Sequence, residues 1–293
     1  MGYVFAFTAI FFAMTKGFCG KKISDYTARP QDAAYYNVIR MLICILVGGV
    51  IVIAEGKGFA VSFHTLIISA LSGLSLAVMV ISWLMAARKS VYMLVDVYCT
   101  LSVAIPLVLS GIFYGETIDL YDIIGLSLLA GATYLIVGYS AITKKKKLKL
   151  PEYIILFLVF LSIGFTNFLQ KVFVKTTTES VNIFNFYTYV FAAFVLALFL
   201  IFTRKENNSE KVKRPIKAYL LVCGMAVALF CNSLFATLAA TKLTSAELYP
   251  LTQGSTLALG PIMAALFFGE KPNLRLVIGI ILCFTGLIVM NVF

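Results

Sequence analysis

Charged and chemically reactive side chains are scarce in this chain. Only 13% of its 293 residues are charged and 61% are hydrophobic, whereas soluble domains have about 25% charged and about 45–50% apolar residues. A water-soluble fold of this length could not bury so much apolar surface, so the chain belongs in a lipid bilayer. Its single histidine, His64, and its lack of HExxH and GxSxG patterns give no basis for an enzyme.

Cysteine and net charge give no sign of a cofactor or of nucleic acid. The six cysteines form no CxxC pair, so the sequence predicts no metal site, no disulfide framework and no cofactor. The net charge is +11, but the lysines and arginines fall between apolar runs, where they report membrane topology. The lipid bilayer is therefore the first partner to expect, and nucleic acid is not expected.

Ten long apolar runs follow one another along the chain. A helix needs roughly 20 apolar residues to cross the hydrocarbon core, and these runs are near that length: 2–19, 33–53, 63–87, 91–114, 120–140, 152–174, 183–203, 218–240, 246–268 and 274–292. They are continuously apolar, whereas strands of a membrane barrel alternate. The first run has no basic leader, so we interpret it as a membrane helix and not as a signal peptide. The predicted fold class is an all-α integral membrane protein with ten transmembrane helices.

One sequence block occurs twice. Pro106–Glu116 is an apolar segment that ends in Gly-Glu, and Pro261–Glu270 repeats this pattern. The two glutamates lie 154 residues apart, and so do the following glycines, Gly125 and Gly279. The offset is close to half the chain, which predicts two homologous halves of five helices each.

The halves, 1–147 and 148–293, are predicted to be inverted repeats. Because five is an odd number, the second half enters the membrane from the opposite side, an arrangement typical of secondary transporters. Lys and Arg in the connections are biased 18 to 3 toward one side, and positive charge favours the cytoplasm. We therefore expect a multi-pass protein of the plasma (inner) membrane with both termini outside.

Four charged residues lie three or more residues from the ends of the apolar runs and are candidates for the transport pathway. Arg40 and Asp96 fall at similar depth in runs that begin on the same side, and we predict that they approach each other in at least one conformational state. Lys16 and Lys171 lie 155 residues apart, close to the repeat offset. A structural ion pair and a substrate or proton site at Asp96 are both open, so proton coupling is one option.

Polar and aromatic residues in the runs complete the candidate substrate cavity: Tyr36, Trp83, Asn167, Gln170, Asn185, Tyr187, Asn232, Tyr249 and Gln253. Interhelical hydrogen bonds and an aromatic belt are alternative explanations for such residues. Three prolines inside the runs are candidates for gating kinks: Pro106, Pro250 and Pro261. Glu116 and Glu270 precede helices, where a carboxylate favours the helix N-terminus.

The chain resembles the drug/metabolite transporter superfamily, EamA type. The second half carries the resemblance in Leu238–Ala246, Pro261–Glu270, Gly279 and Gly286. The first half matches more loosely, in Lys16, Arg40 and Ala86–Ser90. The resemblance implies ten helices in two inverted halves, alternating access, and a central cavity formed by helices 1–4 and 6–9 with helices 5 and 10 behind. It also implies cytoplasmic termini, which is the reverse of the orientation that the charge bias predicts.

A carrier of small metabolites is the function that these features favour. Its substrate would be an amino acid, an organic acid or an amphipathic drug-like compound, and the cations Lys16, Lys171 and Arg40 lean toward a carboxylate or phosphate. A flippase for lipid-linked head groups, or an accessory membrane protein, is the alternative. A lateral gap between helices 4 and 9 would favour the flippase, and a closed central cavity would favour the carrier.

Overall fold

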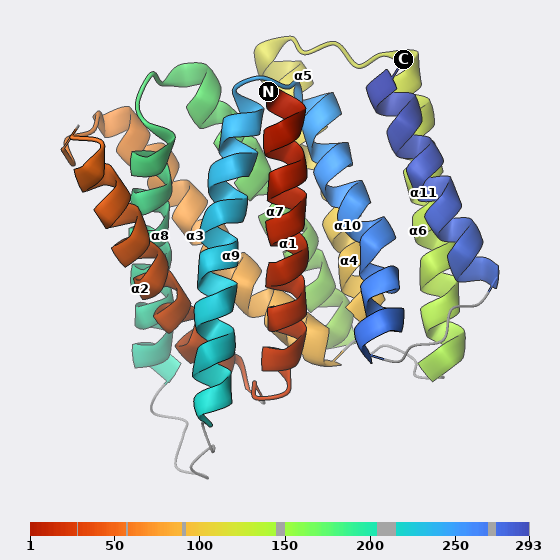
Figure 1. The fold of residues 1–293 in the computed structure, drawn as a ribbon, viewed down its shortest axis with the longest axis horizontal. Helices are drawn as coiled ribbons and strands as arrows, with labels where there is room; N and C mark the ends of the chain where they lie inside the picture. The colour runs from red at the N-terminus through yellow and green to blue at the C-terminus, as the bar shows by residue number, and fades with distance from the viewer. Residues whose placement is uncertain are drawn as a thin grey trace.

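The computed structural model describes residues 1–27, 29–56, 58–89, 92–144, 150–203, 215–268 and 274–292. All regular elements within these ranges are α-helices, which pack side by side with their axes roughly aligned (Figure 1). They are α1 (Gly2–Ser24), α2 (Pro30–Ala54), α3 (Phe63–Lys89), α4 (Tyr92–Leu101), α5 (Ala104–Tyr114), α6 (Leu120–Lys144), α7 (Leu150–Thr176), α8 (Val181–Thr203), α9 (Ile216–Ala240), α10 (Ser245–Phe268) and α11 (Leu274–Val292).

The predicted run 91–114 forms two helices, α4 and α5, instead of one. Pro106 lies in the first turn of α5 and has no N–H to donate to the carbonyl of Ser102. That carbonyl accepts the N–H of Ile105 instead, at 3.1 Å. The backbone hydrogen bonds therefore change here from a spacing of four residues to a spacing of three. The first helix ends at Leu101 and the next begins at Ala104. By contrast, α10 continues through both Pro250 and Pro261.

Carboxylates cap the first turns of three helices. Asp32, Asp122 and Glu247 each occupy the third helical position and accept the backbone N–H of the residue before the helix, at 3.1, 3.0 and 2.7 Å. In α10 the Thr244 hydroxyl returns the bond by accepting the N–H of Glu247 at 3.2 Å. These reciprocal bonds satisfy donors that a helix start leaves open.

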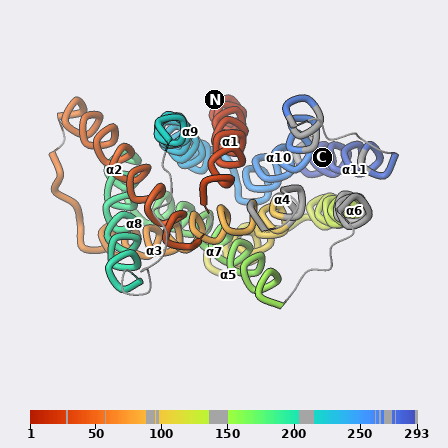
Figure 2. The backbone as a smooth tube through the Cα atoms, turned by 90° about the horizontal axis from the view of Figure 1, so that it is seen from below, coloured from red at the N-terminus to blue at the C-terminus, as the bar shows by residue number. Residues whose placement is uncertain are grey.

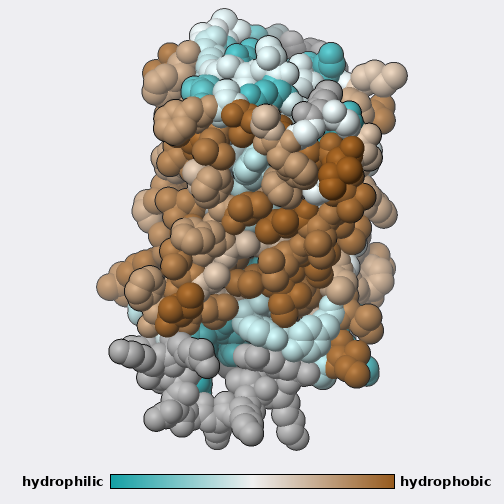
Figure 3. Space-filling view, turned by 90° about the vertical axis from the view of Figure 1, so that its left-hand side faces the viewer, coloured by the Kyte–Doolittle hydropathy of each residue, from teal (hydrophilic) through white to brown (hydrophobic). Residues whose placement is uncertain are grey.

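The surface has the hydropathy pattern of a membrane protein. Within the described residues, six helices are long and apolar enough to cross a bilayer, namely α1, α2, α3, α7, α8 and α9, and three shorter apolar stretches lie at Tyr98–Tyr114, Leu120–Leu135 and Val277–Met290. Large apolar side chains remain exposed, including Phe11, which is 65% exposed. Figure 3 shows an apolar band between polar ends. Apolar patches of this extent mark contact with lipid.

The two halves of the chain interleave. Helix α1 packs against α9 and α3 against α7, so the first and second halves share most of their buried faces. Helices α2 and α8 pair at one end of the bundle, whereas α6 and α11 pair at the other (Figures 1 and 2). Both chain termini lie at the same end of the helices (Figure 1).

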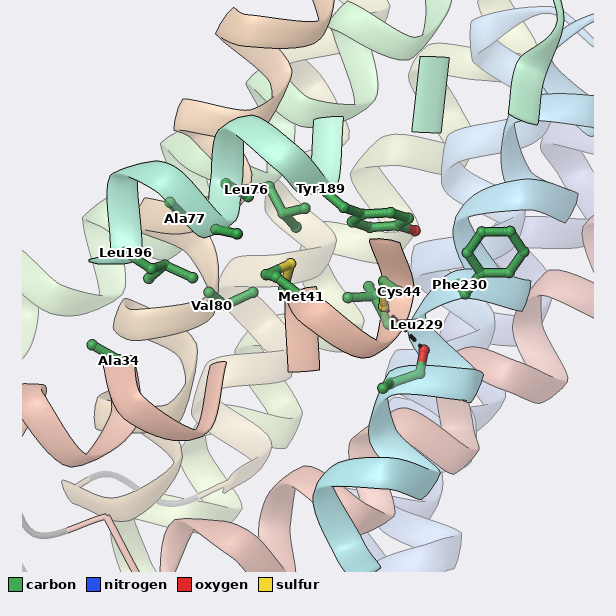
Figure 4. Packing of buried hydrophobic residues seen from close by; sticks show 13 residues of the cluster. Ala34, Met41, Cys44, Leu76, Ala77, Val80, Tyr189, Leu196, Leu229 and Phe230 are labelled. Carbon is green, nitrogen blue, oxygen red and sulfur yellow. Dashed lines mark hydrogen bonds between the residues drawn. The ribbon is translucent and has the colours of Figure 1, made fainter. Parts of the chain in front are cut away.

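The best-packed core lies where α2, α3, α8 and α9 meet. Met41 and Cys44 of α2 contact Val80 of α3, Tyr189 of α8 and Leu229 of α9 (Figure 4). A second cluster joins α6, α10 and α11. At the crossing of α6 and α11, a Cβ on Gly125 would lie 2.8 Å from a backbone oxygen of α11. Only glycine therefore permits this helix separation.

Candidate functional site

A cavity of about 160 Å³ lies at the centre of the bundle. Since one water needs roughly 10–15 Å³ by this measure, the space suits a handful of waters or a small organic molecule. The lining comes from α1, α2, α3 and α4 in the first half and from α7, α8, α9 and α10 in the second half. Among the lining residues that the structure describes, none belongs to α5, α6 or α11. The resemblance implies a cavity formed by helices 1–4 and 6–9, with helices 5 and 10 behind it. Helices α6 and α11 correspond to helices 5 and 10 and do not contribute to the described lining.

Nine of the predicted site residues line this cavity. They are Lys16, Arg40, Trp83, Asn167, Gln170, Asn185, Asn232, Tyr249 and Gln253. They come from seven helices. The bundle therefore gathers side chains from distant parts of the sequence around one space.

Two cations lie on the first-half side of the cavity. Lys16 Nζ donates to Asn232 Oδ1 at 3.3 Å, and Asn232 Nδ2 donates to the carbonyl of Ala9 at 2.9 Å. Arg40 is only 2% exposed, and its Nε has no hydrogen-bond partner among the described residues. The two charges are near enough to interact electrostatically. An anion between them would relieve their repulsion.

Helix α8 supplies a polar wall. Asn185 and Thr188 are three residues apart, which places both on one helical face, and both line the cavity. Asn185 Oδ1 accepts the Ser233 hydroxyl at 2.8 Å, whereas Asn185 Nδ2 and Thr188 Oγ1 have no partner among the described residues. The Tyr249 hydroxyl, on the opposite wall, is satisfied because it donates to the carbonyl of Asn167 at 2.5 Å.

The remaining lining is largely apolar. Trp83 packs against Gly20, where an added Cβ would lie 2.6 Å from the indole ring. Leu76, Met79 and Met225 also line the cavity. Methionine and tryptophan adapt to irregular apolar shapes. The cavity is therefore amphipathic: cations and amides form one part of its wall, and apolar side chains form the remainder.

Three predicted site residues have other surroundings. Tyr187 donates to the carbonyl of Phe59 at 2.7 Å. Tyr36 is buried in a cluster of α2, α3 and α9, with its ring 6.2 Å from that of Tyr219. Lys171 is buried away from the cavity lining. The side chain of Asp96 lies outside the described residues, so the pair with Arg40 stays a prediction. The side chain of Pro261 lies outside them as well.

Lys171 binds Glu116 in a link between the two halves. Lys171 Nζ lies 2.9 Å from Glu116 Oε1 and donates to the carbonyl of Leu243 at 2.8 Å. Glu116 Oε2 accepts the N–H of Ser245 at 2.8 Å, and Lys175 Nζ lies 3.6 Å from Oε1. Glu116 was expected to favour the start of its own next helix. Instead it holds the start of α10, which is far away in the sequence. Glu270 lies outside the described residues.

The electrostatics of this link favour the ionised carboxylate. Desolvation by burial raises the pKa of the Glu116 carboxyl, but the hydrogen bonds from Lys171 and Ser245 and the charge of Lys171 outweigh it. The pKa of Glu116 therefore lies below its ordinary value. At neutral pH the link is an ion pair between loop 115–119 and α7.

Sequence reasoning missed several cavity residues. Thr188, Tyr189 and Ser233 line the cavity but were not singled out, because Ser, Thr and Tyr are common in membrane helices. For Thr188 and Tyr189 the sequence did contain a signal. They follow Asn185 by three and four residues, which places them on the same face of the helix as this candidate residue. Within the described part of the chain, no three His, Cys, Asp or Glu side chains gather in a way that could hold a metal.

Comparison with known proteins agrees with this architecture. A solved structure titled only "Crystal structure of protein" aligns with a TM-score of 0.75 over 99% of this chain and 96% of its own, at 14% identity, which is evidence for the fold alone. No curated protein matches the chain. The apolar helices define a multi-pass membrane protein. Residues 150–292 match the model of the EamA-like transporter family, in line with the resemblance that the sequence showed.

Proposed function

We propose that the protein is a secondary transporter that moves a small metabolite across the plasma membrane by alternating access. The observation that carries this proposal is the amphipathic central cavity, which both halves of the chain line. A site between two repeats can be exposed to either side when one repeat rocks against the other. The candidate substrates are amino acids, organic acids and amphipathic drug-like compounds.

We further propose ten membrane crossings in two inverted repeats, with α4 and α5 together forming the fourth. The helix contacts support a two-fold relation, because exchanging the halves maps one set of contacts onto another. The α1–α9 contact exchanges with α7–α3, and α1–α10 exchanges with α7–α4 and α7–α5. The α2–α8 and α6–α11 contacts each map onto themselves. An odd number of crossings per half then inverts the second half.

A head-group flippase is less well supported. Such a protein needs a lateral opening through which the lipid tail stays in the bilayer. Helix α10 packs against both α4 and α5 in the described residues, at the place where a lateral gap would favour a flippase. A carrier with an enclosed central site therefore fits this arrangement better.

Uptake by proteoliposomes tests the carrier. Labelled amino acids, organic acids and amphipathic compounds would be offered with and without a pH gradient, against protein-free liposomes. One class is expected to enter with saturable kinetics, and Asn232→Leu should slow its uptake because Asn232 lines the cavity and binds Lys16. Tyr134→Phe is the control, since Tyr134 is 79% exposed on α6, away from the lining. Folded protein that moves no compound above background would contradict the proposal.

A further inference from the structure

The central cavity contains buried hydrogen-bond donors without acceptors. Arg40 Nε, Asn185 Nδ2 and Thr188 Oγ1 have no partner among the described residues, although these residues are only 2%, 1% and 4% exposed. Buried polar groups are nearly always satisfied in folded proteins, and leaving one unpaired is costly. Arginine and the amide nitrogen can only donate. A ligand that brings hydrogen-bond acceptors into the cavity would therefore satisfy these groups.

The charge of the described cavity lining is also unbalanced. Lys16 and Arg40 both line it, and the described lining residues include no Asp or Glu. The contact that Lys16 makes is with the neutral amide of Asn232. A buried cation without a counter-charge is unfavourable. A ligand that carries negative charge would supply both the acceptors and the counter-charge.

The rest of the lining indicates the body of that ligand. Trp83, Met79, Met225 and Leu76 form an apolar part of the wall. A bare inorganic anion would leave these side chains facing empty or water-filled space. A molecule with an apolar body and one anionic end uses both parts of the cavity.

We propose that the transported substrate is a small organic carboxylate with an apolar body, whose carboxylate binds the Arg40 guanidinium and the Asn185 amide while Lys16 balances its charge. This inference rests on the proposed carrier function and names the substrate class of the same site. Arginine is suited to this role because its planar donors match the two oxygens of a carboxylate. A zwitterion such as an amino acid fits this site less well, because its ammonium group would require a carboxylate of the protein, and the described lining residues include none.

Four related probes separate the ligand chemistries: phenylacetate, its neutral amide phenylacetamide, the cation 2-phenylethylamine, and phenyl phosphate. Binding to the purified full chain in detergent would be measured by isothermal titration calorimetry. Phenylacetate is expected to bind, and the amide and the amine are expected to bind at least about tenfold more weakly, since a charge-assisted hydrogen bond contributes about 1.5–3 kcal/mol, which is about 10- to 100-fold in affinity.

Variants assign the carboxylate to Arg40. Arg40→Gln should weaken phenylacetate binding about 10- to 100-fold, and Asn185→Leu should weaken it less. Arg275→Gln is the matched control, because Arg275 is exposed on α11, away from the cavity lining. Arg40→Gln is expected to fold, since it removes an uncompensated buried charge. Its melting temperature without ligand checks this, and Asn185→Leu is a second test that keeps the cation.

Three results would overturn the inference: equal binding of phenylacetamide or 2-phenylethylamine, tighter binding of phenyl phosphate, or unchanged affinity in folded Arg40→Gln. The carrier proposal is tested separately by flux. Transport of neutral or cationic compounds without carboxylate binding would remove the carboxylate inference and leave the carrier. Carboxylate binding without flux of any compound would leave the anion site and remove the carrier.

Discussion

The link between Glu116 and Lys171 makes a quantitative prediction about stability. Glu116→Gln keeps the size of the side chain but removes its charge. The carboxylate now receives Lys171 on one oxygen and the Ser245 N–H on the other, at 2.9 and 2.8 Å. An amide has a single oxygen, so it can accept only one of these donors, and its NH₂ group would face the other. Lys171 is 1% exposed and would keep only the Leu243 carbonyl.

The expected loss follows from burial. Removing one partner of a buried ion pair costs about 3–5 kcal/mol because the other charge stays buried without compensation. We expect the lower end, about 3 kcal/mol, since the amide oxygen can still accept one bond. The contact with Lys175, which is 43% exposed, adds little because solvent screens it. At roughly 2–4 °C per kcal/mol for a chain of this size, the melting temperature should fall by about 6–12 °C.

Thermal unfolding in detergent can be followed with a thiol-reactive dye, because Cys44, Cys99 and Cys283 are buried, so the dye reaches their thiols once the helices separate. Glu55→Gln is the control, since Glu55 is exposed and should cost less than about 1 kcal/mol. If Glu116→Gln melts within the error of Glu55→Gln, the link does not stabilise the fold and the reasoning from burial fails.

The same variant has a predicted pH dependence. The pKa of Glu116 lies below its ordinary value because of Lys171 and Ser245, despite burial, so the link contributes its full stability above the unfolded-state pKa of about 4.3. That contribution is lost as the pH falls through the lower, folded-state pKa. The difference in melting temperature between the wild type and Glu116→Gln should therefore be constant near neutral pH and shrink below about pH 4.

Three further outcomes are expected. Gly125→Ala should destabilise the protein by at least about 1–3 kcal/mol in the same dye assay, because its Cβ would lie 2.8 Å from backbone of α11, whereas Gly224→Ala, whose Cβ would lie 3.6 Å from its nearest neighbour, should be tolerated. A cysteine placed within 205–214 should be protected from an impermeant reagent in intact cells, as the 18-to-3 basic bias predicts; labelling from outside would reverse the orientation. Tyr249→Phe should cost about 1 kcal/mol in melting experiments through the lost bond to Asn167.

Most of the fold could be predicted because hydrophobicity alone dictates it. Runs of about 20 apolar residues have one stable form in a bilayer, the helix. The predicted bounds of 183–203 and 274–292 agree with α8 and α11 within two residues at each end. The break between α4 and α5 was less predictable. Pro106 marked it, but Pro250 lies in an unbroken helix, so a proline alone does not decide whether a helix breaks or only bends.

The site was harder to predict because a sequence does not reveal how each helix is rotated. Asn167 and Gln170 face the cavity, whereas Lys171, the next residue, points away from it and binds Glu116. A single residue step rotates a side chain by about 100° around the helix, so consecutive residues of similar polarity contact different parts of the protein. Which face meets the cavity is set by helix packing over long sequence distances. Glu116 illustrates this, since its partners Lys171 and Ser245 follow it by 55 and 129 residues.

Lys16 and Lys171 show how strongly helix rotation determines the surroundings of a side chain. They lie 155 residues apart, which is one residue more than the repeat offset of 154, and their surroundings differ. Lys171 is held by a carboxylate and a carbonyl at the Glu116 link, whereas Lys16 lines the cavity and binds a neutral amide. At the repeat offset of 154, Lys16 is equivalent to Gln170, which lines the cavity as Lys16 does. The shift of one residue places Lys171 on another face of α7, where it binds Glu116. The two halves therefore both present a polar side chain to the cavity at this point, and the lysine of the second half stabilises the link between the halves instead.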